Sequence, residues 1–191
     1  MRTHVYVDAY NLYFGCLKRS AHKWLNIHAL CSVLMPHNDI RAVRYFTAQV
    51  SGTPRDPDQP TRQQTYFRAL RTVPQVSIHL GHFLTHEVSM PDAADWTAGR
   101  YTPRRVMKTE EKGADVNIAT HLLVDAFDDA FDVAVIISND SDLKEPISVV
   151  RNRFGKTIGI LNPQAKVSRV LQPLAHFIKQ IRPGALAWSS A

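Results

Sequence analysis

The chain has 191 residues, 45% of them hydrophobic, which suffices for one compact domain with a buried core and leaves two domains cramped. Lysine and arginine outnumber aspartate and glutamate by 23 to 17, so the composition favours a polyanionic partner without excluding an ordinary enzyme. No stretch approaches the ~18 apolar residues of a membrane span and no signal-peptide core occurs, which predicts a cytoplasmic protein outside the membrane.

The chain contains two cysteines, Cys16 and Cys31, and they form no CxxC pattern. A zinc site would need histidine partners, and His79 and His82 are the only close pair in the sequence. Two buried, reduced thiols are the alternative that a cytosolic protein favours.

Five short apolar runs, each bounded by polar or turn residues, predict five strands. The fourth run is unbroken and rich in β-branched residues, as is typical of a central parallel strand that is covered on both faces. The runs cover residues 4–7, 42–47, 76–80, 133–137 and 157–161.

Stretches with helical spacing lie between these runs. Asn26 is a candidate N-terminal cap for a first helix, which ends at Pro36. Thr61 is a candidate cap for a second helix, which ends before Pro74. A third helix shows the clearest 3.6-residue apolar stripe in the sequence. This stripe consists of Val116, Ala119, Leu123 and Phe127, and a fourth helix, carrying Ile147, Val150 and Phe154, has Gly155 as its stop.

Alternation of strands and helices predicts an α/β domain with a mostly parallel sheet and helices on both faces. Residues 85–108 interrupt this rhythm with Pro91, Gly99 and Pro103, and we interpret them as an irregular insertion that is functional or mobile. We expect one domain over residues 1–181, followed by a loose tail at 182–191 in which Trp188 can dock locally.

Four acidic residues lie at the ends or starts of these predicted elements. Asp8 comes directly after the first strand, Asp140 and Asp142 directly after the fourth, and Asp115 in the first turn of the third helix. Because the carboxyl ends of parallel strands share one edge of the sheet, three of the four must lie there, where ligands of such sheets bind.

Clustered carboxylates repel each other by about 4 kcal/mol per pair at ~4 Å and an effective dielectric near 20. They therefore take up protons or bind a cation, and oxygen ligands favour Mg²⁺ or Mn²⁺. One or two such ions would polarise a phosphoryl group and acidify a water. Taken singly, Asp142 is equally explained as a helix cap and Asp115 as an acid that complements a helix dipole.

Three segments of the chain resemble the motifs of NYN-domain proteins, including the LabA-like branch, in the PIN-like nuclease superfamily. They read Val-Asp-Ala-Tyr-Asn at 7–11, Glu-Lys-Gly-Ala-Asp-Val at 111–116 and Ser-Asn-Asp-Ser-Asp-Leu at 138–143, and the resemblance spans residues 3–161. It implies a three-layer α/β/α sandwich with a central five-strand parallel sheet, a Mg²⁺ or Mn²⁺ site and ribonuclease activity. Asn139 stands where glycine is common and Leu143 where an aromatic residue is common, and neither departure removes a carboxylate.

The resemblance carries metal-site roles onto Asp8, Asp115, Asp140 and Asp142, and a supporting role onto Asn11. In a PIN-like strand order Asp8 and Asp140 are the direct ligands, Asp115 completes the site, and Asp142 acts through water or orients the nucleophile. Asn11 is neutral, so it can hold a carboxylate or a phosphate without adding repulsion.

A second group of residues is expected to support the site or to bind nucleic acid. Ser138 and Glu111 are candidates for contacts to the metal ligands, although Ser138 is equally explained as a turn serine. Glu110 is interpreted as solvated, His121 as a core or interface histidine, and Tyr10 as the aromatic residue able to reach substrate. The candidate nucleic-acid-binding residues are Lys112, Lys108, Arg104, Arg105 and Arg100, with Trp96 or Tyr101 stacking on a base; a solvated loop is the alternative.

These observations predict a metal-dependent endoribonuclease that hydrolyses RNA phosphodiester bonds with an activated water, and RNA is favoured over DNA. The main alternative is a non-catalytic RNA-binding regulatory module with a structural metal ion; DNA or a small phosphoester as the substrate is a third. A homodimer is compatible with a PIN-like domain. The loops that mark dinucleotide binding (GxGxxG) and nucleotide hydrolysis (GxxxxGK[ST]) do not occur in the sequence.

Overall fold

The structure, a computed structural model, describes residues 1–189 and is built around one seven-stranded sheet. The strand order is β4-β3-β2-β1-β5-β6-β7, and every neighbouring pair is parallel except β3 and β4. The strands are β1 (Arg2–Asp8), β2 (Asp39–Ala48), β3 (Val76–Pro91), β4 (Pro103–Lys112), β5 (Val133–Ile137), β6 (Thr157–Asn162) and β7 (Phe177–Gln180).

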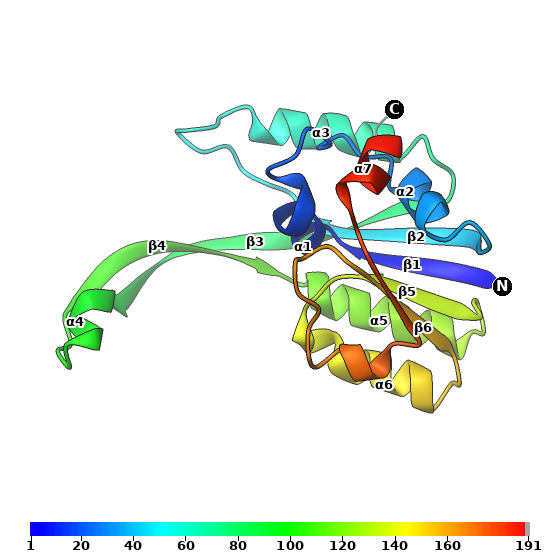
Figure 1. Cartoon of the computed structure of the whole chain (residues 1–191). Helices are drawn as coiled ribbons and strands as arrows, with labels where there is room; N and C mark the ends of the chain where they lie inside the picture. Colours follow the sequence, from blue (N-terminus) through cyan, green and yellow to red (C-terminus); the bar gives the residue numbers. More distant parts are fainter. Residues whose placement is uncertain (190–191) are drawn as a thin grey trace.

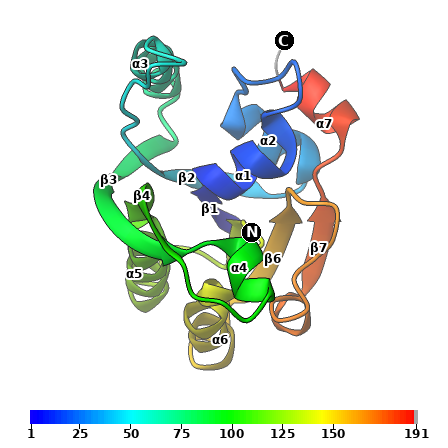
Figure 2. The same ribbon diagram turned by 90° about the vertical axis from the view of Figure 1, so that its left-hand side faces the viewer.

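Helices cover both faces of this sheet (Figures 1 and 2). One face carries α1 (Ala9–Leu12), the π-helix η1 (Tyr13–Leu17), α2 (Ile27–Leu34), α3 (Gln59–Leu70) and α7 (Pro183–Trp188). The other carries α5 (Ala114–Phe127) and α6 (Lys144–Asn152). The remaining helical segments are α4 (Ala93–Thr97) and the 3-10 turns η2 (Ser141–Leu143) and η3 (Gln172–Leu174).

Two apolar cores result, one on each side of the sheet. Leu30 of α2 and Phe67 of α3 pack into the first, and Ile118 of α5 and Ile147 of α6 into the second. Residues of β5 alternate between the two and are buried throughout, as expected for a central strand. The predicted three-layer α/β/α fold is confirmed, with seven strands in place of five.

The two strands that the sequence did not predict lie at the edges of the sheet. β7 has only four residues and pairs with β6 alone, so it needs no long apolar run. β4 begins within the segment that we expected to be irregular and continues four residues beyond it.

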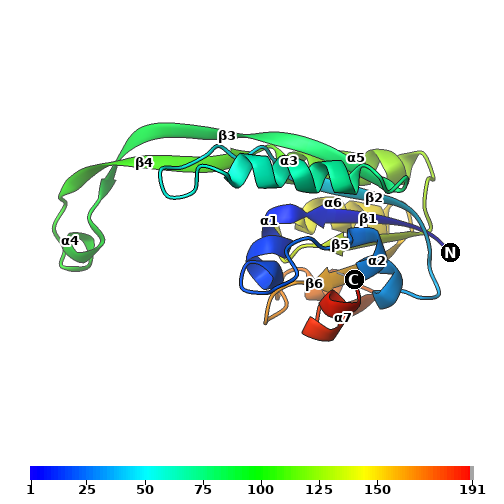
Figure 3. The same cartoon turned by 90° about the horizontal axis from the view of Figure 1, so that it is seen from above.

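Residues 85–108 form a regular hairpin in place of an irregular insertion. β3 continues for 16 residues and pairs antiparallel with β4 from His82↔Lys112 to Pro91↔Pro103, and α4 lies at the tip. We call residues 82–112 the arm; it projects from the carboxyl edge of the sheet, away from the helices (Figures 1 and 3). The two prolines pair at the end of the ladder, where proline is tolerated, and Gly99 has a positive φ of 73° at the tip.

The apolar stripe predicted for the third helix is buried only in part, because Leu123 packs against the core whereas both ends of the stripe are exposed. Val116 is 69% exposed and Phe127 78%, whereas Ile118, Leu122 and Ala126 face the core. Both sets repeat with helical periodicity, and their centres lie about 105° apart at 100° per residue, so periodicity alone could not choose between them.

The predicted helix start at Asn26 is confirmed, because its side chain accepts a hydrogen bond from the backbone nitrogen of Ala29 at 3.0 Å. The predicted cap at Thr61 is wrong. α3 begins at Gln59, after Asp58, and Pro60 occupies its first turn, a position where the missing N–H of proline costs nothing.

The C-terminal segment also differs from the loose tail that we expected at 182–191. Residues 183–188 form α7, Leu186 is buried, and the backbone nitrogen of Asn26 donates to the carbonyl of Ser189. Trp188 is 79% exposed, so it does not dock, and residues 190 and 191 lie outside the described residues. Within residues 1–189, no helix combines the length and the apolar character that crossing a membrane requires.

Candidate functional site

The site begins where β1 and β5 end. These strands are parallel neighbours in which Val7 pairs with Ile137, so Asp8 and the loop that opens with Ser138 leave the sheet side by side. Asp8 is only 4% exposed. Figure 2 shows the molecule from the side of this edge, with the arm in front.

Hydrogen bonds fix the carboxylate of Asp8. The backbone nitrogen of Asn11 donates to Oδ1 at 2.9 Å, and both Asn11 Nδ2 and the Ser138 hydroxyl donate to Oδ2 at 2.9 Å. Burial raises the pKa of Asp8 and outweighs these hydrogen bonds, and the charge of Asp140 raises it further. Asp8 is thus held in one orientation beside a second carboxylate.

The loop after β5 supplies Asp140 and Asp142. The backbone nitrogen of Asp140 donates to the Ser138 hydroxyl at 3.1 Å, so Ser138 links Asp8 to Asp140. Asp140 Oδ1 accepts from the backbone nitrogen of Asp142 at 3.0 Å and caps the 3-10 turn. The capping role considered for Asp142 therefore belongs to Asp140, and Asp142 is exposed.

The third contribution comes from the junction of β4 and α5. Gly113 turns the chain with a φ of 100°, and Glu111 Oε1 accepts from the backbone nitrogen of Ala114 at 3.0 Å at the start of α5. Gly81 of β3 allows this close approach, since a Cβ there would lie 2.6 Å from Glu111 Oε1. Asp115 follows in the first turn, facing the same edge.

The five acidic groups influence each other electrostatically. Burial raises the pKa of Asp115 to about 6, and the charges of Asp8, Asp140, Glu111 and Asp142 contribute. Burial also raises the pKa of Glu111, helped by the charge of Asp8. No ion pair to any of these five carboxylates is formed within residues 1–189.

A hard divalent cation fits the chemistry of this donor set, because unpaired carboxylates that raise each other's pKa are stabilised by positive charge. In the described part of the chain, however, no three His, Cys, Asp or Glu side chains are arranged to hold an ion directly. Both oxygens of Asp8 and one of Asp140 already accept hydrogen bonds. An ion here would therefore depend on side-chain movement or on bridging waters, which Mg²⁺ commonly retains.

An amide network that sequence reasoning missed surrounds the acids. Asn11 Oδ1 accepts from the backbone nitrogen of Asn139 at 3.2 Å and from Gln164 Nε2 at 2.9 Å. Gln164 follows β6, and its backbone contacts the buried Asn162 at the end of that strand. The rule that found Asp8 and Asp140, polar residues directly after a strand, would also have found Asn162.

The basic residues expected to bind nucleic acid are not gathered around the acids. Most of them lie along the arm or at its tip, exposed, and each is paired with a neighbouring acid. The pairs are Arg100–Asp95, Arg104–Asp92, Arg105–Glu87, Lys108–Glu110 and Lys112–Glu110. Only Lys112 lies at the base of the arm, next to Glu111, while Trp96 and Tyr101 are exposed near the tip.

The structure does not bring the cysteines and histidines considered for a zinc site together. Cys31 belongs to α2 and is buried in the core on that face of the sheet. The ring centroid of His79 lies 4.2 Å from that of His121, and His79 stacks on Phe46 on the other face. Burial, followed by the proximity of His121, lowers the pKa of His79 to about 4, so this pair is neutral at pH 7. Cys16 is only half-buried, in contrast to the expectation of two buried thiols.

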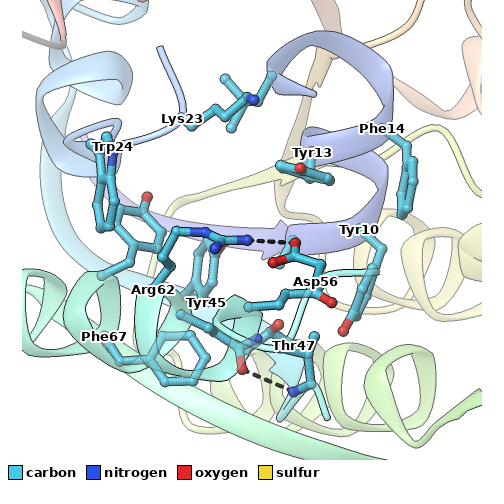
Figure 4. Close-up of a pocket in the computed structure, with 16 residues that line it drawn as sticks. Tyr10, Tyr13, Phe14, Lys23, Trp24, Tyr45, Thr47, Asp56, Arg62 and Phe67 are labelled. Carbon is cyan, nitrogen blue, oxygen red and sulfur yellow. Dashed lines mark hydrogen bonds and ion pairs between the residues drawn. The ribbon is translucent and has the colours of Figure 1, made fainter. Parts of the chain in front are cut away.

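An aromatic cavity of about 380 Å³ adjoins the acids, and sequence reasoning did not find it. It lies between α1, η1, α3 and β2 (Figure 4). Its aromatic lining comes from four separate segments, so no local pattern marks it. The lining includes Tyr10, Tyr13, Phe14, Trp24, Tyr45 and Tyr66, with Lys23, Asp56 and Arg62 as charged members.

Comparisons with known proteins agree with this architecture. The sequence profile of the NYN domain matches residues 2–181. The 6-hydroxy-3-succinoylpyridine 3-monooxygenase HspA of Pseudomonas putida is 30% identical over 215 aligned positions, which cover 98% of this chain and 69% of that protein. The crystal structure of a Vibrio parahaemolyticus protein of unknown function matches with a TM-score of 0.63 at 18% identity, covering 95% of this chain and 93% of that one. This last likeness shows the fold alone.

Proposed function

The chain belongs to the NYN domain family, within the PIN-like nuclease superfamily, and from this premise we propose that it is a divalent-metal-dependent endoribonuclease. One observation carries the proposal: Asp8, Asp140 and Asp142, Glu111 and Asp115 come from three distant segments to one edge of the sheet without a cationic partner in the described chain. Such an arrangement costs stability unless a cation uses it.

The way in which each group is held supports the roles that we propose. Asp8 and Asp140 would be direct ligands, linked through Ser138, and Asp115 would complete the site from α5. Asp142 is exposed and would act through water or orient the nucleophile. A bound Mg²⁺ or Mn²⁺ would polarise the phosphodiester and acidify a water. Asn11 keeps Asp8 in place without adding charge.

RNA is the proposed substrate, with single-stranded or loop regions preferred. The excess of basic residues favours a polyanion, and aromatic side chains beside the acids suit unstacked bases. A homodimer stays compatible with this proposal.

The test is cleavage of labelled single-stranded RNA with Mg²⁺, Mn²⁺ or EDTA. Asp8→Asn and Asp140→Asn should each reduce cleavage by more than the ~10–100-fold that is typical of groups that only support a metal ligand. Asp128→Asn, an exposed acid just after the far end of α5, is the matched control. Full activity of both site variants would exclude the mechanism, and RNA binding without cleavage under any metal would favour the regulatory module. Labelled DNA of the same sequence tests the choice of substrate.

The Pseudomonas relative favours a second candidate, oxidation of a small pyridine. That protein is named as a monooxygenase, is similar over nearly this whole chain, and the aromatic cavity is large enough for a single ring. A monooxygenase transfers one atom of O₂ to its substrate and reduces the other to water with two electrons from a donor. Substrate-dependent O₂ uptake with 6-hydroxy-3-succinoylpyridine and NADH would establish this candidate, and the nuclease proposal predicts none.

A further inference from the structure

The aromatic cavity has the walls of a stacking site. Trp24 and Tyr45 both meet the ring of Tyr66 edge-on, with centroids 6.2 and 6.1 Å apart, and Tyr10 stacks on Phe14 at 6.4 Å. Its volume of about 380 Å³ lies at the small end of the ~300–1,000 Å³ range of small-molecule sites. The cavity therefore has room for one nucleotide and not for a longer stretch of a strand.

Tyr45 provides an unused hydrogen-bonding group in this cavity. Its side chain is only 7% exposed and lines the space (Figure 4), yet its hydroxyl has no hydrogen-bond partner in the described chain. By contrast, the Tyr66 hydroxyl donates to the carbonyl of Leu25 at 2.7 Å and that of Tyr10 to the carbonyl of Ala48 at 3.2 Å. This hydroxyl is not among the fully buried, unpartnered polar atoms of the described chain, so it is open to the cavity and available to hydrogen-bond a ligand there.

The charged residues at the rim favour an anion. Lys23 is exposed and belongs to the lining of the cavity, and Arg62 pairs with Asp56 at 2.5 Å while half of its side chain stays exposed (Figure 4). Two cations face one carboxylate, so the rim has a net positive charge. A guanidinium presents five donors, which leaves Arg62 able to bind a phosphate as well as Asp56.

The cavity is continuous with the acidic edge. Ala9 and Tyr10 line it and follow Asp8 directly in the chain. The charges of Glu111 and Asp8 both act on the Tyr10 hydroxyl, whose pKa burial raises to about 12. A group bound in the cavity therefore lies next to the carboxylates.

We propose that this cavity binds the base of the nucleotide next to the scissile phosphate, and that the Tyr45 hydroxyl hydrogen-bonds the edge of that base. Rings from α1, η1 and α3 stack on the base, and Lys23 and Arg62 bind the phosphate on its other side. The assignment to a scissile phosphate rests on the proposed nuclease function. The positive rim would also attract a free aromatic acid, and the binding test below distinguishes that ligand from a nucleotide.

Fluorescence of Trp24 tests the proposal directly. In a Trp96→Phe/Trp188→Phe background Trp24 is the remaining tryptophan, and titrations in EDTA prevent metal-dependent cleavage. UMP or AMP should change the emission saturably, whereas ribose 5-phosphate should not. Tyr45→Phe should weaken nucleotide binding about three- to tenfold, the value of one hydrogen bond. Its melting temperature should stay equal or rise, because the lost hydroxyl has no partner in the free protein. Thr120→Val, which removes an exposed hydroxyl of α5 on the other face of the sheet, is the matched control.

Several results would overturn the proposal. These are the absence of saturable binding by either nucleotide, an equal response to ribose 5-phosphate, binding of pyridine-3-carboxylate alone, or unchanged affinity in Tyr45→Phe. Asp8→Asn separates this proposal from the nuclease proposal, because it should abolish cleavage and leave UMP binding intact. Nucleotide binding without cleavage in the wild-type protein would refute the nuclease alone, and cleavage without nucleotide binding would refute the cavity alone.

Discussion

Asn11 contacts both carboxylate oxygens of Asp8, through its backbone nitrogen to Oδ1 and its side-chain amide to Oδ2, each at 2.9 Å. The carbonyl oxygen of the same side chain accepts from the backbone of Asn139 and from Gln164. One neutral residue thus connects the segments that follow β1, β5 and β6. Together with Ser138, it holds the carboxylate of Asp8 in its orientation.

Replacing Asn11 tests this dependence. Asn11→Ala should reduce RNA cleavage by about 10–100-fold and raise the Mn²⁺ concentration needed for half-maximal rate, because Asp8 loses its support. Asn152→Ala should leave both quantities unchanged, because in the described chain the amide of Asn152 donates to Ser148 on α6 and to no group of the site. Equal metal dependence in Asn11→Ala and wild type would refute the positioning role.

Asp115 should make the metal-free protein less stable as pH rises. Its pKa of about 6 in the folded state exceeds the usual 3.8, so the folded state binds more protons between these values. Stability is therefore lost as pH increases from about 4 to 6 and stays lower above that window. Asp115→Asn should reduce this loss, measured as melting temperature at pH 5 and pH 8 in EDTA. If Asp115→Asn and Asp128→Asn lost the same stability between pH 5 and pH 8, the raised pKa of Asp115 would be refuted.

Metal addition should have the complementary effect. Mg²⁺ or Mn²⁺ at about 100 times its dissociation constant should stabilise the protein by ~2.7 kcal/mol at pH 8, and less at pH 5, where protons compete. EDTA should reverse the shift. The Asp8→Asn/Asp140→Asn double variant, which lacks both proposed ligands, should show none. A shift of equal size in that variant would place the ion elsewhere.

A buried network between α5 and the sheet predicts a purely structural effect. Asp125 accepts from the Tyr6 hydroxyl at 2.7 Å and from Arg44 Nη2 at 2.6 Å, and also contacts His4. Burial would raise the pKa of Asp125, but these partners outweigh it and hold that pKa well below its usual range. The stabilisation is present above the unfolded pKa near 4 and is lost as pH falls below it.

Asp125→Asn should accordingly reduce the free energy of unfolding at pH 7 by about 3 kcal/mol, because Arg44 loses its buried counter-charge. Chemical denaturation measures the change. Asp128→Asn should stay within ~0.5 kcal/mol of wild type. A matching stability of the two variants would show that the network contributes nothing.

Shortening the arm tests whether the body folds without it. Replacing residues 86–108 by Asn-Gly joins Thr85 to Thr109, which are opposite each other in the ladder, through a two-residue turn. The melting temperature should change little, because the two strands of the arm pair with each other beyond the helices. UMP binding should also persist. Weaker retention of long RNA would support the nucleic-acid role expected for the arginines of the arm, and failure to fold would show that the arm is part of the core.

Local pattern and chain order were enough to predict the central strands and the acids that follow them. Apolar runs specify buried strands, and a parallel sheet directs their carboxyl ends to one edge, so the amino-acid order alone places Asp8 near Asp140. The helix cap at Asn26 could be predicted for a similar reason, since a capping side chain contacts the backbone only three residues away.

Packing between the layers, in contrast, determines which apolar residues of α5 are buried. This choice depends on the contact of Ile118 with the sheet and of Asp125 with Arg44. Packing also brings Gln164 to Asn11, 153 positions away, and Tyr45 and Trp24 to one cavity. These contacts join distant segments, and the sequence of either segment does not indicate the other as its partner. Periodicity along one segment does not encode which distant segment will lie against it.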